Sequence, residues 1–222
     1  KGEYDSKISY KNEMEKIFEA TEFKNIKEIL YHSAEKYAQN IAFKIKHKDE
    51  KKVSYEDVTY ERLLKDINKL GTAFYNMGLK AKRIAIIGKN RYEWVISHLA
   101  NLLGGIVSVP LDKDLQYEEL ENSLIRSKAD CIIFDEKLTP TMKQIQESNN
   151  TSLANYVCMG EIEGFQSVKE LLKQGEDLLE QGQTEYLNAE IDENIMNILL
   201  FTSGTTSQSK AVMLSQRNIA SN

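Results

Sequence analysis

Short apolar runs alternate with longer amphipathic segments from Arg83 to Leu179, and this alternation constrains the fold more than any other feature of the chain. The apolar runs lack an inside–outside alternation, which is typical of strands buried on both faces of a sheet. They are RIAIIG (83–88), IVSVP (106–110), CIIFD (131–135) and NYVCM (155–159). The segments with helical spacing cover 91–105, 116–127, 140–148 and 168–179. This order predicts an α/β fold: a doubly wound, mostly parallel sheet with helices on both faces.

The residues before Arg83 predict a helix, two strands and a second helix. The first helix is expected over 23–38, and the strands are expected over 41–46 and 51–60. The second helix has apolar residues at helical spacing from Tyr60 to Met77, with Thr59 suited to the N-cap and Gly78 to the stop. Residues 1–22 are polar and predict an extension, and residues 182–195 predict a polar connector.

Composition excludes several classes of protein. The net charge of −5 provides no basic stripe for nucleic acid. No apolar stretch approaches the roughly 20 residues of a transmembrane helix, and the first residues lack the apolar core of a secretory signal. Cys131 and Cys158 lie in apolar runs, so we expect buried free thiols in a reducing, cytoplasmic protein. Two distant cysteines and three scattered histidines do not supply a zinc site. Peripheral membrane contact and oligomeric state stay open.

The segment LLFTSGTTSQSKAVMLSQRN (199–218) concentrates small polar residues between two apolar runs. Short hydroxyl side chains donate hydrogen bonds, glycine lets the backbone come close, and lysine supplies positive charge. Such a loop suits an anion, above all a polyphosphate. The candidate residues for binding it are Thr202, Ser203, Gly204, Thr205, Thr206 and Lys210.

Two common phosphate loops do not fit this segment. A dinucleotide fingerprint requires three glycines after a strand, and IIGKNRYEW offers only Gly88. A Walker A loop requires a second glycine and a hydroxyl after the lysine, where this chain has Ser209 and Ala211. The residues after the loop also favour a strand. We therefore predict strands over 197–203 and 211–215, an exposed loop over 204–210, and a helix from about Gln216.

This strand–loop–strand segment resembles the signature of the adenylate-forming superfamily, which comprises acyl-CoA synthetases, luciferases and peptide-synthetase adenylation domains. The family pattern is approximately TSGTTGxPKGV followed by R-N. The matching residues are Thr202, Ser203, Gly204, Thr205, Thr206, Lys210, Val212, Arg217 and Asn218. The departures are Ser207, Ser209 and Ala211, and Ser207 adopts a positive φ less readily than glycine. We therefore expect a narrower set of loop conformations than in most relatives.

A second match lies upstream. GKNRYEWVIS (88–97) is similar to an N-x-x-E-W segment of long-chain acyl-CoA synthetases, and 104–135 resembles the next two βα units. The resemblance covers the chain from about Ile26 onward and is strongest with bacterial long-chain fatty acyl-CoA synthetases. It implies that residues 1–222 are part of the large N-terminal domain, without the C-terminal lid.

The resemblance implies the chemistry as well. Relatives make an acyl adenylate from a carboxylate and ATP, which releases pyrophosphate from the ATP, and then pass the acyl group to CoA. Thr202 to Thr206 would surround the β- and γ-phosphates, Lys210 would offset their charge, and Mg²⁺ would bridge phosphate oxygens. The catalytic residues would lie beyond Asn222, so we expect the chain alone to be inactive.

Other polar residues favour structural roles. Glu93, Trp94 and His98 lie in a packed helix, and Glu118 and Glu119 suit a solvated helix face. Three alternatives stay open: an enzyme that adenylates an amino acid or aryl acid, a Walker-type ATP enzyme, and a non-catalytic α/β interaction module with a degenerate loop.

Overall fold

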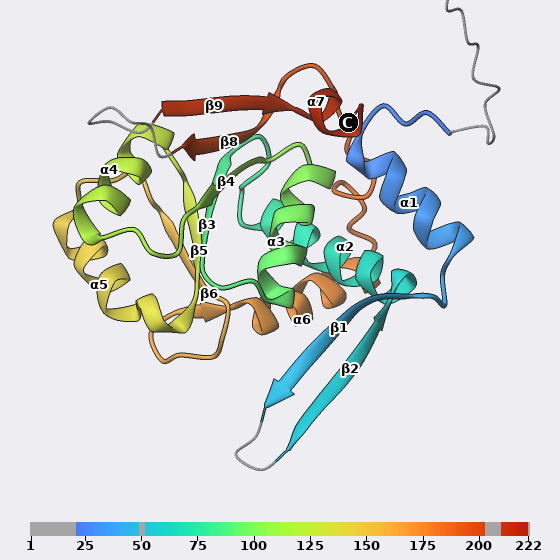
Figure 1. The fold of residues 1–222 in the computed structure, drawn as a ribbon, viewed down its shortest axis with the longest axis horizontal. Helices are drawn as coiled ribbons and strands as arrows, with labels where there is room; N and C mark the ends of the chain where they lie inside the picture. The colour runs from blue at the N-terminus through green and yellow to red at the C-terminus, as the bar shows by residue number, and fades with distance from the viewer. Residues whose placement is uncertain (1–20, 49–51, 203–209, 222) are drawn as a thin grey trace, which may run out of the picture.

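In residues 21–48, 52–202 and 210–221, which this computed structural model describes, a seven-stranded sheet lies between two helical layers, with a two-stranded hairpin beside them (Figure 1). The helices are α1 (Ile26–Lys36), α2 (Tyr60–Asn76), α3 (Tyr92–Leu103), α4 (Tyr117–Ser127), α5 (Thr139–Ser148), α6 (Val168–Glu180) and α7 (Gln216–Ala220). The strands are β1 (Ile41–Lys48), β2 (Val53–Thr59), β3 (Arg83–Ile87), β4 (Val107–Leu111), β5 (Cys131–Phe134), β6 (Asn155–Cys158), β7 (Gln166–Ser167), β8 (Met196–Thr202) and β9 (Lys210–Ser215). A 3-10 helix, η1 (Glu136–Leu138), precedes α5.

The sheet has the strand order β7-β6-β5-β3-β4-β8-β9. Neighbouring strands are parallel except β8 and β9, which are antiparallel. The chain begins the sheet at β3, adds β4 on one side, and then crosses over to add β5, β6 and β7 on the other. This arrangement confirms the predicted doubly wound α/β fold with a mostly parallel sheet.

The central strands bury both of their faces. In β3, Ile84 and Ile86 pack in one hydrophobic cluster with residues of α2, α3 and α6. Ala85 and Ile87 pack in a second cluster with residues of α4 and α5. All four side chains are fully buried. Two covered faces explain why these strands are apolar without alternation.

The boundaries of α2 follow the predicted signals. Thr59 has extended backbone geometry, and its hydroxyl accepts a hydrogen bond from the Arg62 amide at 3.2 Å. Gly78 has a φ of +76°, a value that glycine adopts more readily than other residues, and its amide donates to Tyr75 O. Both residues act as the sequence predicts: Thr59 caps the start of the helix and Gly78 ends it.

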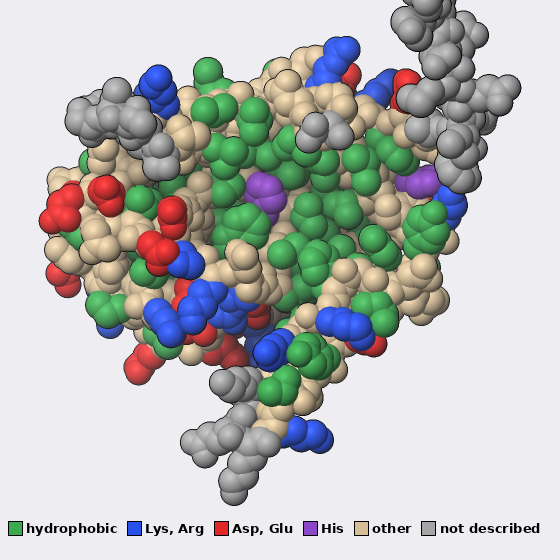
Figure 2. Space-filling model, in the orientation of Figure 1, with side chains coloured by type: hydrophobic (Ala, Val, Ile, Leu, Met, Phe, Trp, Pro, Cys, Tyr) green, Lys and Arg blue, Asp and Glu red, His purple; other side chains and the backbone are tan. Residues whose placement is uncertain are grey.

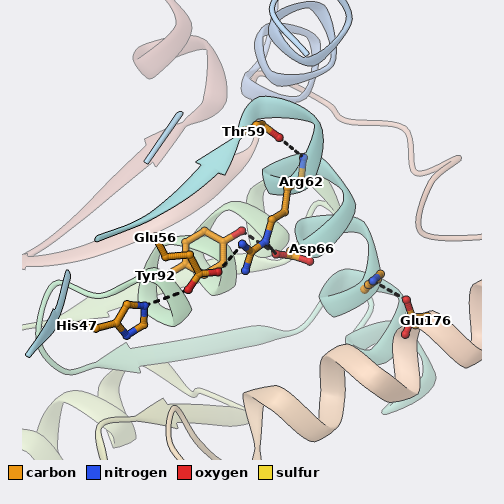
Figure 3. A network of polar contacts seen from close by, with 8 residues as sticks. His47, Glu56, Thr59, Arg62, Asp66, Tyr92 and Glu176 are labelled. Atoms are coloured by element: carbon orange, nitrogen blue, oxygen red, sulfur yellow. Dashed lines mark hydrogen bonds and ion pairs between the residues drawn. The ribbon is translucent and has the colours of Figure 1, made fainter. Parts of the chain in front are cut away.

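The β1–β2 hairpin extends away from the body beside α2 (Figure 1). A chain of polar contacts joins its strands to α2 and α3 (Figure 3). His47 Nε2 lies 3.0 Å from Glu56, and Glu56 accepts a hydrogen bond from Arg62. Arg62 also lies 3.6 Å from Asp66, which accepts from the Tyr92 hydroxyl at 2.8 Å. The hairpin is therefore held partly by exposed charges.

The connector between α6 and β8 carries a buried aromatic side chain. Tyr186 is 1% exposed, and its hydroxyl donates to Ala100 O at 2.8 Å. The ring occupies space left by two glycines: a Cβ built on Gly71 would lie 1.9 Å from the ring, and one on Gly104 would lie 2.5 Å from it. A segment with polar composition is thus fixed to the core by one side chain.

Hydrophobic side chains gather over α3 on the face shown in Figure 2, whereas acidic side chains gather near α4 and α5. Trp94 and Leu99 of α3 are only partly buried. An extended apolar face of this kind is typical of a surface that packs against further protein. Among the described residues, no helix has the length and apolar character needed to cross a bilayer.

Candidate functional site: the β8–β9 hairpin

The two ends of the predicted phosphate loop face each other on adjacent strands. Thr202, the last residue of β8, is the register partner of Lys210, the first residue of β9. The Thr202 hydroxyl donates to Lys210 O at 3.4 Å. Lys210, which the sequence placed in the loop, thus begins the second strand. Ser203, Gly204, Thr205 and Thr206, together with the altered position Ser207, lie outside the described residues.

The loop between β8 and β9 begins at the carboxyl edge of the parallel sheet. Ser108 of β4 pairs with Ile198 of β8, and the two strands run in the same direction. Thr202 therefore lies toward the edge where β3, β4 and β5 also end. Open α/β sheets bind their ligands outside the carboxyl ends of the strands. The position of the hairpin thus suits a ligand-binding loop.

The structure contradicts the Walker-type alternative. That architecture requires a helix immediately after the lysine, but Ala211 lies within β9. The next helix, α7, begins only at Gln216 and is capped by Ser215, whose hydroxyl accepts from the Asn218 amide. The described parts of the segment are two strands followed by a helix, as predicted, and the predicted loop between the strands lies outside the described residues except for Lys210.

Lys210 lies on the exposed part of β9. Within residues 21–48, 52–202 and 210–221 it makes no ion pair, so no carboxylate of this part of the chain neutralises its charge. An exposed ammonium group beside a hydroxyl-rich loop can approach a phosphate without first breaking a salt bridge.

A second cation lies near the start of the loop. The Arg126 guanidinium in the last turn of α4 lies 5.2 Å from the centre of the Phe201 ring, next to Thr202. The sequence pattern does not predict this role for Arg126, because a basic residue near a helix C-terminus is usual for reasons of helix stability alone. Only the packing of α4 beside β8 brings it to the hairpin.

The residues assigned to structural roles in the α3 region make structural contacts. The rings of Trp94 and His98 lie 5.2 Å apart, and His98 Nδ1 lies 2.8 Å from Ser108 Oγ. Burial lowers the pKa of His98 to about 4, so its ring is neutral at physiological pH. Glu93 pairs with Arg91 at 2.7 Å. None of these contacts is with the β8–β9 hairpin.

Both cysteines are buried free thiols, as predicted. Burial raises the pKa of Cys131 and of Cys158 above the ordinary value of a thiol. Neither thiol is therefore activated as a nucleophile. In the part of the chain that the structure describes, no cluster of three His, Cys, Asp or Glu side chains could hold a metal ion.

Comparison with known proteins defines the class of the molecule. Residues 30–222 match the family model described as AMP-binding enzyme. The chain belongs to this family.

Two curated members of the family are similar in sequence to this chain. The chain is 28% identical over 184 residues to long-chain-fatty-acid–CoA ligase 5 of Rattus norvegicus, a match that covers 76% of this chain and 26% of that protein. It is 27% identical over 167 residues to crotonobetaine/carnitine–CoA ligase of Shigella flexneri, covering 72% of this chain and 31% of that protein. The chain thus spans about a quarter to a third of the length of these relatives.

Solved structures share the fold. A long-chain-fatty-acid–CoA ligase from Archaeoglobus fulgidus superposes with a TM-score of 0.72 at 20% identity, covering 91% of this chain and 38% of that one. The anthranilate CoA ligase AuaEII, in complex with anthranoyl-AMP, gives the same TM-score and identity over 87% of this chain and 35% of that one. At these identities the likeness establishes the fold alone.

Proposed function

We propose that this chain is part of an AMP-forming acid–CoA ligase and carries its triphosphate-binding hairpin. The enzyme joins a carboxylate to ATP, releases pyrophosphate, and transfers the acyl group from the adenylate to CoA. The observation that carries the proposal is the pairing of Thr202 with Lys210 at the carboxyl edge of the sheet, at the two ends of a hydroxyl-rich loop.

In this proposal, Thr202, Ser203, Gly204, Thr205 and Thr206 hold the β- and γ-phosphates through hydroxyl and backbone N–H groups. Lys210 offsets the charge that develops on the departing pyrophosphate. A hydrogen bond to a charged oxygen contributes about 1.5–3 kcal/mol, so several such contacts fix the triphosphate firmly.

The proposed ligands are ATP and CoA, with Mg²⁺ on the nucleotide. Thr202 and Lys210, the described residues at the ends of the loop, include no carboxylate. Their chemistry suits phosphate oxygens, so Mg²⁺ would be held mainly by the nucleotide. The metal would supply charge neutralisation of the phosphates.

We propose a long-chain fatty acid as the substrate and the cytoplasm as the location. The first part rests on the relative that acts on long-chain fatty acids and on the N-R-Y-E-W segment at 90–94. The second rests on two buried free thiols.

The test is carboxylate-dependent ATP–pyrophosphate exchange by the polypeptide extended to the length of its relatives. Palmitate, carnitine, anthranilate and a mixture of amino acids are compared as substrates. Exchange with palmitate above the other acids supports the proposal. Exchange only with another acid would correct the substrate, and no exchange with any acid would contradict the ligase activity.

A further inference from the structure

The β8–β9 hairpin has little packing to hold its outer strand in place. The four residues from Lys210 to Met213 are all exposed, and Met213 is 69% exposed. In the described sheet β9 is the edge strand, with β8 as its single pairing partner. Among the described residues, contacts that fix the direction of the hairpin must therefore come mainly from its base.

Two buried amide side chains form these contacts at the base. Gln216 is fully buried, and its Nε2 donates to Asn197 Oδ1 and to Leu102 O, both at 2.6 Å. Its Oε1 accepts from the Ile26 amide at 3.0 Å. Asn197, 3% exposed, donates through Nδ2 to Ile106 O at 2.8 Å. We call Asn197 and Gln216 the amide clamp.

The amide clamp joins elements that are distant in the sequence. Asn197 lies in β8, and Gln216 follows β9 directly. Their partners are the end of α3, the residue before β4, and the start of α1. A side-chain hydrogen bond between α7 and the connector, from Arg217 to Asn194 at 3.3 Å, is exposed. The buried hydrogen bonds at the base therefore converge on the two amides.

Asn197 also occupies an irregular position in the ladder. Met196 pairs with Ser215, but Ile198 pairs with Leu214, so β8 has one extra residue at this point. Such a bulge bends the strand, increases its local twist and redirects one side chain. Here the redirected side chain is the one that meets Gln216.

A small change of angle at the base of the β8–β9 hairpin produces a larger displacement at its loop end. Thr202 lies five residues beyond Asn197, which is about 17 Å along an extended strand. A tilt of about 10° at the bulge would move the start of the loop by about 3 Å. A misplacement of only about 1 Å can lower a rate by about a hundredfold.

We infer that Asn197 and Gln216 are positioning residues for the phosphate loop: they fix the angle at which the β8–β9 hairpin presents Thr202 and Lys210 to the triphosphate. The inference rests on the proposed function for its activity readout. The control of β9 by the amide clamp does not depend on the proposed function.

The test uses Gln216→Met and Asn197→Ala in the polypeptide extended to the length of its relatives. Methionine keeps the volume of the glutamine side chain but removes its hydrogen bonds, which favours folding of the variant. Three quantities are measured: KM for ATP in pyrophosphate exchange, the rate at which CoA captures synthetic acyl adenylate, and deuterium uptake of peptides covering 210–215. Because no triphosphate takes part in the capture step, a positioning role predicts a split between the first two quantities.

We expect each variant to raise KM for ATP by about tenfold, with capture changed less than about twofold, and to speed deuterium uptake in β9. The double variant should raise KM for ATP by at most about twice the increase seen in the more impaired single variant. Both substitutions act through one contact network, so their effects should not multiply. Asn101→Ala is the matched control: its amide is fully buried, but its hydrogen bond goes to Ser108 Oγ at 3.2 Å, in β4. It should change neither KM for ATP nor uptake in β9.

Equal losses in exchange and capture, or an Asn101→Ala variant that behaves like Gln216→Met, would show a general role in stability and overturn the inference. Folded Gln216→Met and Asn197→Ala variants with unchanged KM for ATP would overturn it as well. A wild-type protein without exchange would contradict the proposed function instead, and deuterium uptake in β9 would still decide whether the amide clamp controls the hairpin.

Discussion

At the scale of single residues, Tyr186 shows how one side chain organises a polar segment. Its ring lies against Gly71 in α2 and Gly104 after α3, in space that a Cβ at either glycine would fill. A glycine within a helix normally lowers stability relative to alanine by about 1 kcal/mol. The packing of the Tyr186 ring therefore explains why residue 71 is a glycine.

Gly71→Ala should destabilise the protein by about 1–3 kcal/mol despite the higher helix propensity of alanine, because the new methyl group overlaps the Tyr186 ring. Tyr186→Phe should cost about 1 kcal/mol, the contribution of the hydrogen bond to Ala100 O. Urea unfolding measures both, with exposed Lys65→Ala on the same helix as the control. A stabilising Gly71→Ala would contradict the packing described.

His98 predicts a pH dependence of stability. Its pKa is lowered by burial to about 4 from an ordinary value of 6.5, so between these values the unfolded chain binds a proton that the folded chain does not. Stability should therefore fall by about 1–3 kcal/mol as the pH decreases from 6.5 to 4, the lower figure allowing for partial exposure of the ring. His98→Leu should remove this part of the pH dependence. The free energy of unfolding in urea is measured at pH 7 and pH 5 for the wild type and for His98→Leu. An equal decrease in both proteins would contradict the prediction.

At the scale of elements, the β1–β2 hairpin depends on charges that solvent reaches. The hydrogen bond from Arg62 lowers the pKa of Glu56, with a further contribution from His47. A carboxylate whose pKa is lower in the folded state stabilises the fold at pH values above its ordinary pKa of 4.5. This stabilisation is lost as the pH falls through the pKa of the folded state.

Glu56→Gln should weaken the attachment of the hairpin by about 0.2–1 kcal/mol at pH 7, since both partners are more than 40% exposed. Deuterium uptake of peptides from β1 and β2 should increase in the variant, and about 1 M salt should produce much of the same increase in the wild type. Uptake that is unchanged by both the substitution and salt would mean that apolar packing alone holds the hairpin.

Elements with a local signal were predictable from the sequence. The apolar strands, the cap at Thr59 and the strand after Lys210 all depend on neighbouring residues. β7 was not predicted, because two residues carry too little pattern. Burial of Tyr186 and Gln216 was not predicted either, since their partners lie far away in the sequence and come together only in the fold.

The candidate site shows the same limit. Sequence motifs located Thr202 and Lys210, but the register that pairs them and the approach of Arg126 depend on tertiary contacts. Similarly, Asn197 and Gln216 are polar residues without a local pattern, and their amides meet beside a bulge in β8 that the sequence does not predict.

At the scale of the whole molecule, the chain covers 26% of the long-chain-fatty-acid–CoA ligase that it matches. The family resemblance implies that the catalytic residues lie beyond Asn222. We therefore predict that the 222-residue chain by itself forms no acyl adenylate and binds ATP only weakly. Turnover of palmitate and ATP by the purified chain would contradict this prediction.

The most direct test of the central claim is Lys210→Ala in the polypeptide extended to the length of its relatives. If Lys210 neutralises the departing pyrophosphate, adenylation should slow by about ten- to a hundredfold, equivalent to about 1.5–3 kcal/mol. Capture of pre-formed acyl adenylate by CoA should change little, because that step contains no triphosphate. The measurement is pyrophosphate exchange without CoA beside CoA capture of synthetic adenylate, with Lys210→Arg as the charge-preserving control. A loss confined to exchange is the predicted result, and equal losses in the two steps would contradict the phosphate role of the hairpin.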